Sequence, residues 1–189
     1  MTTARQVLFI QGGGAGTHDD WDNKLVESLL RALGEGYEVR YPRMPDEDNP
    51  GQAAWSAAIR RELAALADGA VVVGHSVGAT LLINALAGQS PGCALAAIVL
   101  IAAPFVGEGG WPGDEFELPK NLGTRLPHGV RVHVFHGLRD GTVPPSHADL
   151  YAEAIPQALV HRLPGRDHQL NNDLSDVAKA IGTSARSLP

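Results

Sequence analysis

The chain has 189 residues, of which 44% are hydrophobic, so it is long enough for one domain with a buried core. Its formal net charge is -6 at pH 7, and no run of basic residues exceeds the pair Arg60-Arg61, so we expect no nucleic-acid partner. The single cysteine, Cys93, excludes an internal disulfide and disfavours a zinc-thiolate site.

The first residues contain no long apolar segment. The apolar run at 7–10 is too short for a signal peptide or for a membrane span. We therefore expect a cytoplasmic protein without a membrane partner. Nothing in the sequence indicates an oligomeric state.

The same run at 7–10 predicts the first strand. It leads into a glycine-rich loop at 12–16, which is typical of a buried parallel strand followed by a close approach of the backbone. Asp22 is expected to cap the helix that follows, and Gly34 is expected to end it. The apolar stripe of this helix consists of Leu25, Val26, Leu29, Leu30 and Leu33.

A second strand is predicted at 37–41 and a second helix at 52–67, where apolar side chains recur at helical spacing. The valine run at 71–73 then predicts a strand that leads directly into Gly74-His75-Ser76-Val77-Gly78. The apolar pattern after this pentapeptide predicts a helix that ends near Gly88. We therefore expect Ser76 at a sharp turn between a strand and a helix.

The apolar run at 96–102 predicts a central strand covered on both faces. The span 103–128 is then too rich in Pro and Gly for a long helix, and we expect a short cap or lid that crosses the site. The remaining predictions are strands at 130–135 and 159–163, helices at 146–155 and 173–181, and a frayed tail at 183–189.

About six strands that alternate with helices predict a single α/β domain over residues 1–189. The expected architecture has three layers, with a doubly wound, mostly parallel sheet in the middle. In such a sheet the reactive groups gather at the carboxyl ends of the strands.

Ser76 is predicted to be a nucleophile. A serine on so sharp a turn is pushed out above the sheet, and glycines stand two positions to either side because side chains there would collide with neighbouring elements. The N–H groups at the start of the next helix favour an anion, such as the oxyanion of an acyl-transfer intermediate. The alternative is an ordinary turn in which Ser76 only caps the helix.

A serine hydroxyl needs a positioned base, and His168 is the predicted one. It follows the last predicted strand, where the loop returns to the carboxyl edge of the sheet. His75 flanks the nucleophile, so its side chain cannot readily turn back onto Ser76. Other histidines are predicted in connecting loops, strands or a helix: His18, His128, His133, His161 and His147.

Asp140 is the predicted acid that orients His168 and stays ionised. It lies in the turn after the preceding strand, which places nucleophile, acid and histidine in that order along the chain. Its alternative roles are an Asx turn or a salt bridge with Arg139. The rival acids are Asp167, Asp114 and Glu115.

The oxyanion donors are predicted from the loops around Ser76. Val77 is expected to supply one amide, and Gly12 or Gly13 the other. A phosphate cradle is disfavoured, because the glycine loop lacks a GKS or GKT ending and has Thr17 where a third glycine is needed. The acidic group His18, Asp19, Asp20 and Asp22 predicts a solvated loop with a helix cap, and we expect no metal or cofactor.

These motifs together resemble the α/β-hydrolase superfamily over nearly the whole chain. The resemblance rests on the pentapeptide at 74–78, on His136-Gly137-x-x-Asp140-x-x-Val143-Pro144, and on the glycine-led loop that carries His168. The short length and small cap resemble its minimal branch, the serine hydrolases similar to retinoblastoma-binding protein 9. The sequence departs from the pattern at Gln11, where many relatives have His, and at Asp167, where the final histidine is usually preceded by Gly.

The resemblance and the residues imply a cofactor-independent serine hydrolase, similar to carboxylesterases. Its expected substrate is a small carboxylic ester or related acyl compound, cleaved through an acyl-enzyme. Phe105, Trp111, Phe116 and Leu118 are predicted to line the acyl pocket, with packing under the loop as the alternative. Two other functions stay open: a non-catalytic interaction protein on the same fold, and acyl transfer to an acceptor other than water.

Overall fold

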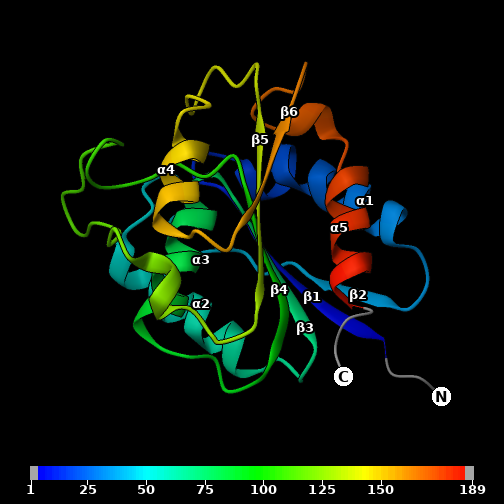
Figure 1. Ribbon diagram of the computed structural model, residues 1–189. Helices are drawn as coiled ribbons and strands as arrows, with labels where there is room; N and C mark the ends of the chain where they lie inside the picture. The colour runs from blue at the N-terminus through cyan, green and yellow to red at the C-terminus, as the bar shows by residue number, and fades with distance from the viewer. Residues whose placement is uncertain (1–3, 186–189) are drawn as a thin grey trace.

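The structure, a computed structural model, describes residues 4–185. A parallel sheet forms the middle layer of the protein. The sheet has six strands in the order β2-β1-β3-β4-β5-β6, all parallel. Helices α1 and α5 cover one face, and α2, α3 and α4 cover the other (Figure 1). The three-layer, doubly wound fold expected from the sequence is therefore confirmed.

The elements have the following bounds. The strands are β1 (Arg5–Ile10), β2 (Tyr37–Arg40), β3 (Ala70–His75), β4 (Leu95–Ile101), β5 (Arg131–Gly137) and β6 (Leu159–Leu163). The α-helices are α1 (Asp22–Leu33), α2 (Gln52–Ala64), α3 (Ser76–Gly88), α4 (His147–Ala154) and α5 (Ser175–Ala185). Short helical turns of other types are η1 (Thr17–Trp21), η2 (Leu122–Arg125) and η3 (Leu170–Asn172).

Strand β3 shows how the sequence distributes side chains between the two faces. Side chains alternate along a strand, so Val71 and Val73 pack with α1 and α5, while Val72 packs into the core beneath α2 and α3. Every residue of β3 is buried, which explains its uninterrupted apolar run. His75 is in phase with Val71 and Val73, and its side chain therefore belongs to the α1 and α5 face.

The turn at Ser76 depends on its flanking glycines. Ser76 has a φ of 52°, in the left-handed region that residues with a side chain rarely adopt. A Cβ at Gly74 would lie 2.5 Å from the Cα of Ala79 in α3, and one at Gly78 would lie 1.8 Å from the carbonyl oxygen of Gln11. The steric reason for glycine that the pentapeptide predicted is confirmed at both positions.

Asp22 does not cap α1, and this expectation was wrong. The cap position is Trp21, which makes no side-chain capping hydrogen bond, while Asp22 is the first helical residue and is fully buried. The reason is helical phase: Leu25, Val26 and Leu29 follow Asp22 at intervals of three, four and seven residues, so all four side chains face inward.

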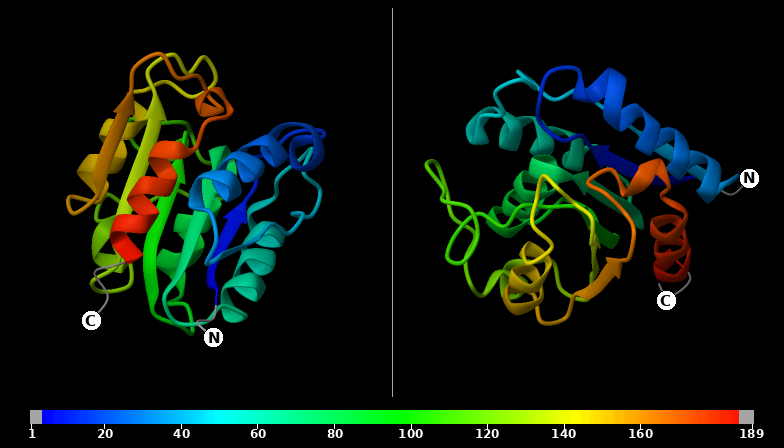
Figure 2. Two further views of the ribbon diagram at one scale, coloured as in Figure 1. Left: turned by 90° about the vertical axis from the view of Figure 1, so that its right-hand side faces the viewer. Right: turned by 90° about the horizontal axis from the view of Figure 1, so that it is seen from above.

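The span 103–128 has little regular structure apart from η2 and an isolated bridge between Val106 and Trp111. Its apolar side chains Phe105, Leu118, Leu122 and Leu126 are buried in the same core as α3. Part of the span projects outward beyond α4 (Figure 2). Its Glu115 accepts a hydrogen bond of 2.6 Å from the N–H of Gln52, the first residue of α2.

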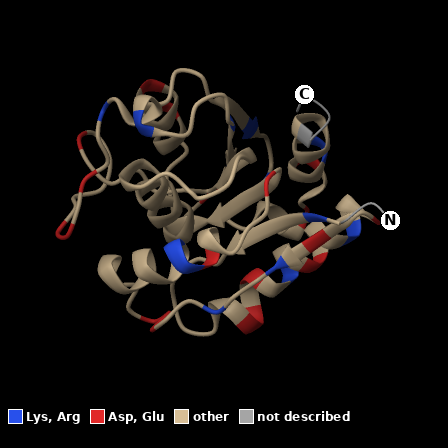
Figure 3. Cartoon of the chain, turned by 90° about the horizontal axis from the view of Figure 1, so that it is seen from below, with Lys and Arg blue, Asp and Glu red and all other residues tan. Residues whose placement is uncertain are grey.

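The C-terminal helix extends further than expected. Helix α5 continues to Ala185, so the first residues of the predicted tail are helical, while 186–189 lie outside the described residues. Acidic and basic positions are interspersed over the helices and loops (Figure 3). None of the helices in the described part of the chain is long and apolar enough to cross a membrane.

The close approach at Gly78 predicts a large effect of one methyl group. We expect Gly78→Ala to destabilise the protein by about 3 kcal/mol, because the new Cβ meets backbone that cannot move aside cheaply. The control is Gly182→Ala in α5, where a Cβ meets no atom within 4 Å, and where alanine should stabilise the helix by about 0.8 kcal/mol. Urea denaturation measures both changes, and equal stabilities for the two variants would contradict the steric argument.

Candidate active site

The candidate site lies at the carboxyl edge of the sheet. Ser76 directly follows β3, Asp140 lies in the loop after β5, and His168 lies in the loop after β6. The loops after β5 and β6 meet at the top of the molecule as drawn in Figure 1. The chain winds from β1 toward β2 in one direction and from β3 toward β4 in the other, and such reversals of strand order form crevices for ligands.

The structure brings the three predicted residues into one hydrogen-bonded chain. Nε2 of His168 lies 3.0 Å from Oγ of Ser76, and Nδ1 of His168 lies 2.8 Å from Oδ2 of Asp140. An ionised carboxylate only accepts hydrogen bonds, so Nδ1 carries the hydrogen and the Nε2 lone pair faces the serine hydroxyl. This arrangement can remove a proton from Ser76.

Asp140 is held as an anion by its surroundings. Its Oδ1 accepts the N–H groups of Thr142 and Val143, each at 2.8 Å, while His136 Nε2 lies 3.3 Å from the Oδ2 that faces His168. Burial opposes ionisation, but the hydrogen bonds from His136, His168 and Val143 outweigh it and hold the pKa of Asp140 well below its usual range. The Asx turn considered as an alternative role for Asp140 is also present, because its Oδ1 accepts the N–H of Thr142, two residues further along the chain.

His136, quoted above only as part of the motif around Asp140, is a neighbour of the site for which the sequence predicted no role. It is buried at the end of β5, and its Nε2 donates to the carbonyl of Val143 at 2.9 Å. The available signal was its position four residues before Asp140, across the turn.

The rival acids have other partners. Asp167 faces Asn171, since its Oδ1 accepts the Asn171 N–H at 2.7 Å and its own N–H donates to the Asn171 side chain at 3.0 Å. Glu115 bonds to the start of α2, as described above, and Asp114 is exposed. Within residues 4–185, no cluster of three or more His, Cys, Asp or Glu side chains could hold a metal ion.

The expected oxyanion donors differ in availability. The N–H of Gly12 donates to Oδ2 of Asp22 at 2.7 Å, so it is already engaged. The N–H of Gly13 has no acceptor among the described residues, and a Cβ on Gly13 would lie 2.9 Å from Cγ1 of Val77. Val77 lies in the first turn of α3, where N–H groups lack partners within the helix. Gly13 and Val77 therefore lie side by side next to Ser76.

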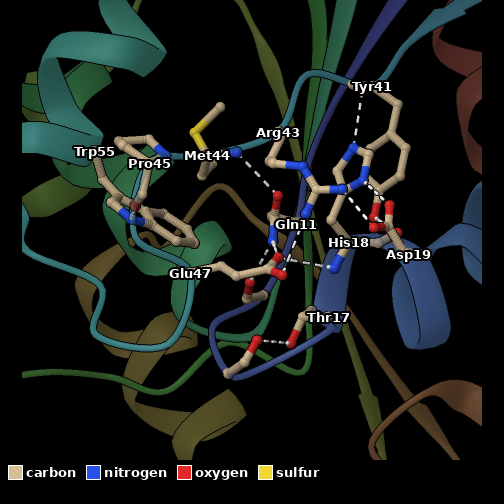
Figure 4. Close-up of polar contacts among 12 residues, drawn as sticks. Gln11, Thr17, His18, Asp19, Tyr41, Arg43, Met44, Pro45, Glu47 and Trp55 are labelled. Atoms are coloured by element: carbon tan, nitrogen blue, oxygen red, sulfur yellow. Dashed lines mark hydrogen bonds and ion pairs between the residues drawn. The ribbon is translucent and has the colours of Figure 1, made fainter.

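The loop after β1 is fastened by Gln11 and Glu47 (Figure 4). Gln11 donates from Nε2 to Glu47 Oε2 at 2.6 Å and accepts the N–H of Met44 at 2.9 Å. Glu47 also accepts the N–H of His18 at its carboxylate and, at its carbonyl, the N–H of Gly14. Burial opposes ionisation of the Glu47 carboxyl, but the hydrogen bonds from Gln11 and from the N–H of His18, together with the charge of Arg43, outweigh it and lower the pKa of Glu47. Gln11 thus ties the glycine loop to the segment at 42–50.

The predicted acyl-pocket residues lie in different surroundings. Phe105 is 4% exposed and packs edge-on against Tyr151, while Trp111 is 39% exposed and packs against His147. Phe116 is half-buried against the core. Phe105 and Leu118 line a pocket of about 710 Å³ together with Leu150 of α4, but Ser76, Asp140 and His168 are not part of its wall.

A second histidine–aspartate contact lies beside Ser76, and the sequence analysis missed it. Nδ1 of His75 lies 2.9 Å from Oδ2 of Asp22, and both side chains are buried. The signals were the strand phase that His75 shares with Val71 and Val73 and the helical phase that Asp22 shares with Leu25.

Comparisons with known proteins agree with this architecture. The model of the alpha/beta hydrolase family matches residues 7–183. A search of the curated proteins found no match.

Solved structures with the same fold include three hydrolases. One is a serine hydrolase involved in carbazole degradation (TM-score 0.73, 16% identity, covering 97% of this chain and 92% of that one). Another is an esterase domain from Rhodothermus marinus (TM-score 0.67, 24% identity, covering 98% of this chain and 88% of that one). The third is a serine hydrolase without a lid from Xanthomonas campestris (TM-score 0.61, 20% identity, covering 100% of this chain and 86% of that one). At these identities the likeness shows the fold alone.

The lowered pKa of Asp140 predicts a dependence of stability on pH. A carboxyl with a depressed pKa stabilises the folded state above its unfolded pKa of about 3.9, and this contribution is lost as pH falls toward the folded value. We therefore expect wild type to be more stable than Asp140→Asn at pH 7, with the difference narrowing below about pH 4. Urea denaturation at a series of pH values tests this, and a difference that is constant with pH would contradict it.

Proposed function

The chain belongs to the alpha/beta hydrolase family, and from this premise we propose that it is a serine hydrolase that cleaves a small carboxylic ester or related acyl compound. The observation that carries the proposal is the chain of hydrogen bonds from Ser76 through His168 to Asp140, with heavy-atom distances of 3.0 Å and 2.8 Å. Both distances lie within the reach required of a nucleophile, its base and the group that orients the base.

In the proposed reaction, Ser76 Oγ attacks the acyl carbon while its proton passes to Nε2 of His168. The ionised Asp140 stabilises the imidazolium that forms. His168 then returns the proton to the alkoxide of the leaving alcohol, and an acyl-enzyme remains. A water molecule, deprotonated by the same nitrogen, attacks the acyl-enzyme and releases the acid and the free serine.

The oxyanion of each tetrahedral intermediate is proposed to bind between the N–H groups of Val77 and Gly13. Support comes from their adjacency and from the lack of another acceptor for Gly13 within the described residues. The N-terminus of α3 adds a favourable dipole at the same point. Such donors stabilise the charge that develops only in the transition state.

The strained backbone at Ser76 favours catalysis over a vestigial site. A φ of 52° costs free energy, which is offset elsewhere and is typical of functional positions. A protein that used the fold only for interaction would not need a serine in this conformation beside a bonded histidine. Acyl transfer to another acceptor would use the same residues.

We further propose that residues 1–189 are one domain and that the span 103–128 is a short cap beside the acyl site. In this span Trp111 is exposed and Phe116 is half-buried, so both offer apolar surface, while Phe105 is buried against Tyr151. The six-stranded sheet and the shortness of this span support a place in the minimal branch of the family, with the small hydrolases similar to retinoblastoma-binding protein 9. Structural neighbours named as esterases are in keeping with an ester substrate.

The nucleophile and the base can be tested together. We expect a fluorophosphonate probe to label wild type and not Ser76→Ala, and we expect His168→Ala to lower turnover of nitrophenyl esters by about 10⁴-fold or more, since triad members act as a unit. Matched controls are Ser90→Ala and His128→Ala, both at exposed positions. Unlabelled wild type, or a His168→Ala variant with most of its turnover, would overturn the proposal.

The oxyanion donor predicts a separate effect at Gly13. A Cβ there would lie 2.4 Å from Cγ of Pro50 and would shift the Gly13 amide away from Val77. We expect Gly13→Ala to lower kcat by about 100-fold, the usual cost of losing one oxyanion donor. Gly51→Ala, where a Cβ meets no atom within 4 Å, is the control, and steady-state kinetics measures both. Equal kcat values in the two variants would remove Gly13 from this role.

A further inference from the structure

His75 and Asp22 form a buried pair directly beside the nucleophile. His75 is the last residue of β3 and is 1% exposed, while Asp22 is the first residue of α1 and is 0% exposed. The triad as proposed uses neither side chain. A buried ionisable pair next to a reactive serine needs an explanation, because burying charged groups costs free energy unless they are paired.

Both ring nitrogens of His75 face oxygen atoms. Nδ1 lies 2.9 Å from Oδ2 of Asp22, and Nε2 lies 3.1 Å from the main-chain carbonyl oxygen of His168. A carbonyl oxygen can only accept, so Nε2 must carry a hydrogen. A neutral ring would then present the Nδ1 lone pair to a carboxylate oxygen, which is repulsive. Both contacts are satisfied together when His75 is an imidazolium and Asp22 is a carboxylate.

Asp22 also holds the loop after β1. Its Oδ2 accepts the N–H of Gly12 at 2.7 Å, in addition to the bond from His75. Its Oδ1 is buried without a partner among the described residues, so the carboxylate acts through a single oxygen.

The pair therefore contacts the backbone on both sides of Ser76. Through Gly12 it fixes the residue before Gly13, the proposed oxyanion donor, and through the carbonyl of His168 it fixes the backbone that carries the base. A Cβ on Gly12 would lie 3.2 Å from His75 Nδ1 and 3.2 Å from Ser76 Cβ, so these segments are in close contact.

We propose that His75 and Asp22 are positioning residues for the serine hydrolase, and that their ion pair holds the His168 backbone and the oxyanion loop in register with Ser76. This inference rests on the function proposed above. Neither residue reacts with the substrate; the pair acts through His168 and Gly12. A base misplaced by about 1 Å can cost about 100-fold in rate, which is the scale on which such positioning matters.

The pair makes this positioning sensitive to pH. The groups that face His75 are Asp22 from α1, the carbonyl and ring of His168 after β6, and Asp140 after β5. Burial lowers the pKa of His75, but the Asp22 carboxylate, the His168 carbonyl and the Asp140 charge outweigh it, so the pKa is raised. The ion pair is complete below that raised pKa and is lost as pH rises through it, which releases one of the two contacts.

Asp22→Asn tests this mechanism. Asparagine can offer one oxygen to Gly12 and His75 but carries no charge. The His75 imidazolium should therefore become neutral at a lower pH in the variant than in wild type. Between the His75 pKa of the variant and the raised His75 pKa of wild type, we expect kcat to fall by roughly 10-fold to 100-fold relative to wild type, with KM within about twofold. The ratio to wild type should recover as pH falls below this window, where His75 is protonated in both proteins. Asp20→Asn, an exposed carboxylate in the same segment, is the control and should keep the wild-type profile.

A second measurement does not depend on turnover or on the Asp22 variant. In Ser76→Ala protein, ¹⁵N NMR of the His75 ring at about pH 7 should show both nitrogens protonated. An ordinary histidine, whose pKa is near 6.5, would be mostly neutral at this pH. A neutral His75 ring, or an Asp22→Asn loss of kcat that is the same at every pH, would overturn the proposal. A protonated His75 in a chain that no fluorophosphonate labels would instead place the failure in the proposed hydrolase function.

Discussion

The left-handed backbone at Ser76 is the constraint on which the rest of the site depends. It turns the chain from β3 into α3 within one residue, and this requires that α3 pass close to β3 at Gly74 and close to the end of β1 at Gly78. The same close packing places the side chain of Val77 against Gly13. One strained residue and two missing side chains therefore bring the serine, the helix N-terminus and the glycine loop to a common point.

Around this turn, two aspartate–histidine pairs lie on different elements. Asp140 and His168 come from the loops after β5 and β6, and Asp22 and His75 come from α1 and β3. The first pair must leave the Nε2 atom of its histidine free to accept a proton, and its partner there is a hydroxyl. The second pair points its Nε2 at a carbonyl, which can only accept, so it cannot serve as a base. The partner of Nε2 distinguishes the two histidines: a hydroxyl that can donate its proton allows proton transfer, while a carbonyl that only accepts can only hold the ring in position.

Local patterns predicted much of the fold. The helix from Asp22 to the glycine after Leu33, the strand at 159–163 and the buried runs of β3 and β4 follow from periodicity and from turn residues, which act over a few positions. The proximity of Ser76, Asp140 and His168 followed from strand order, since the carboxyl ends of parallel strands share one edge. Their catalytic role remains a prediction. The span 103–128 could be recognised only as a segment without helix or strand periodicity. Its path through the structure could not be predicted, because it is set by long-range packing.

Asp22 shows why side-chain pairing was harder to predict than backbone structure. An aspartate before an apolar stripe is a common cap, and the local rule chose that role, but the residue is also in phase with the stripe and so points inward. A buried carboxylate at that position requires donors from elsewhere in the chain, here Gly12 and His75. Gln11 illustrates the same point at the neighbouring residue, where its amide bonds to the backbone of Met44 and the side chain of Glu47. In both cases phase indicates that a polar group is buried, and only the tertiary structure supplies its partners.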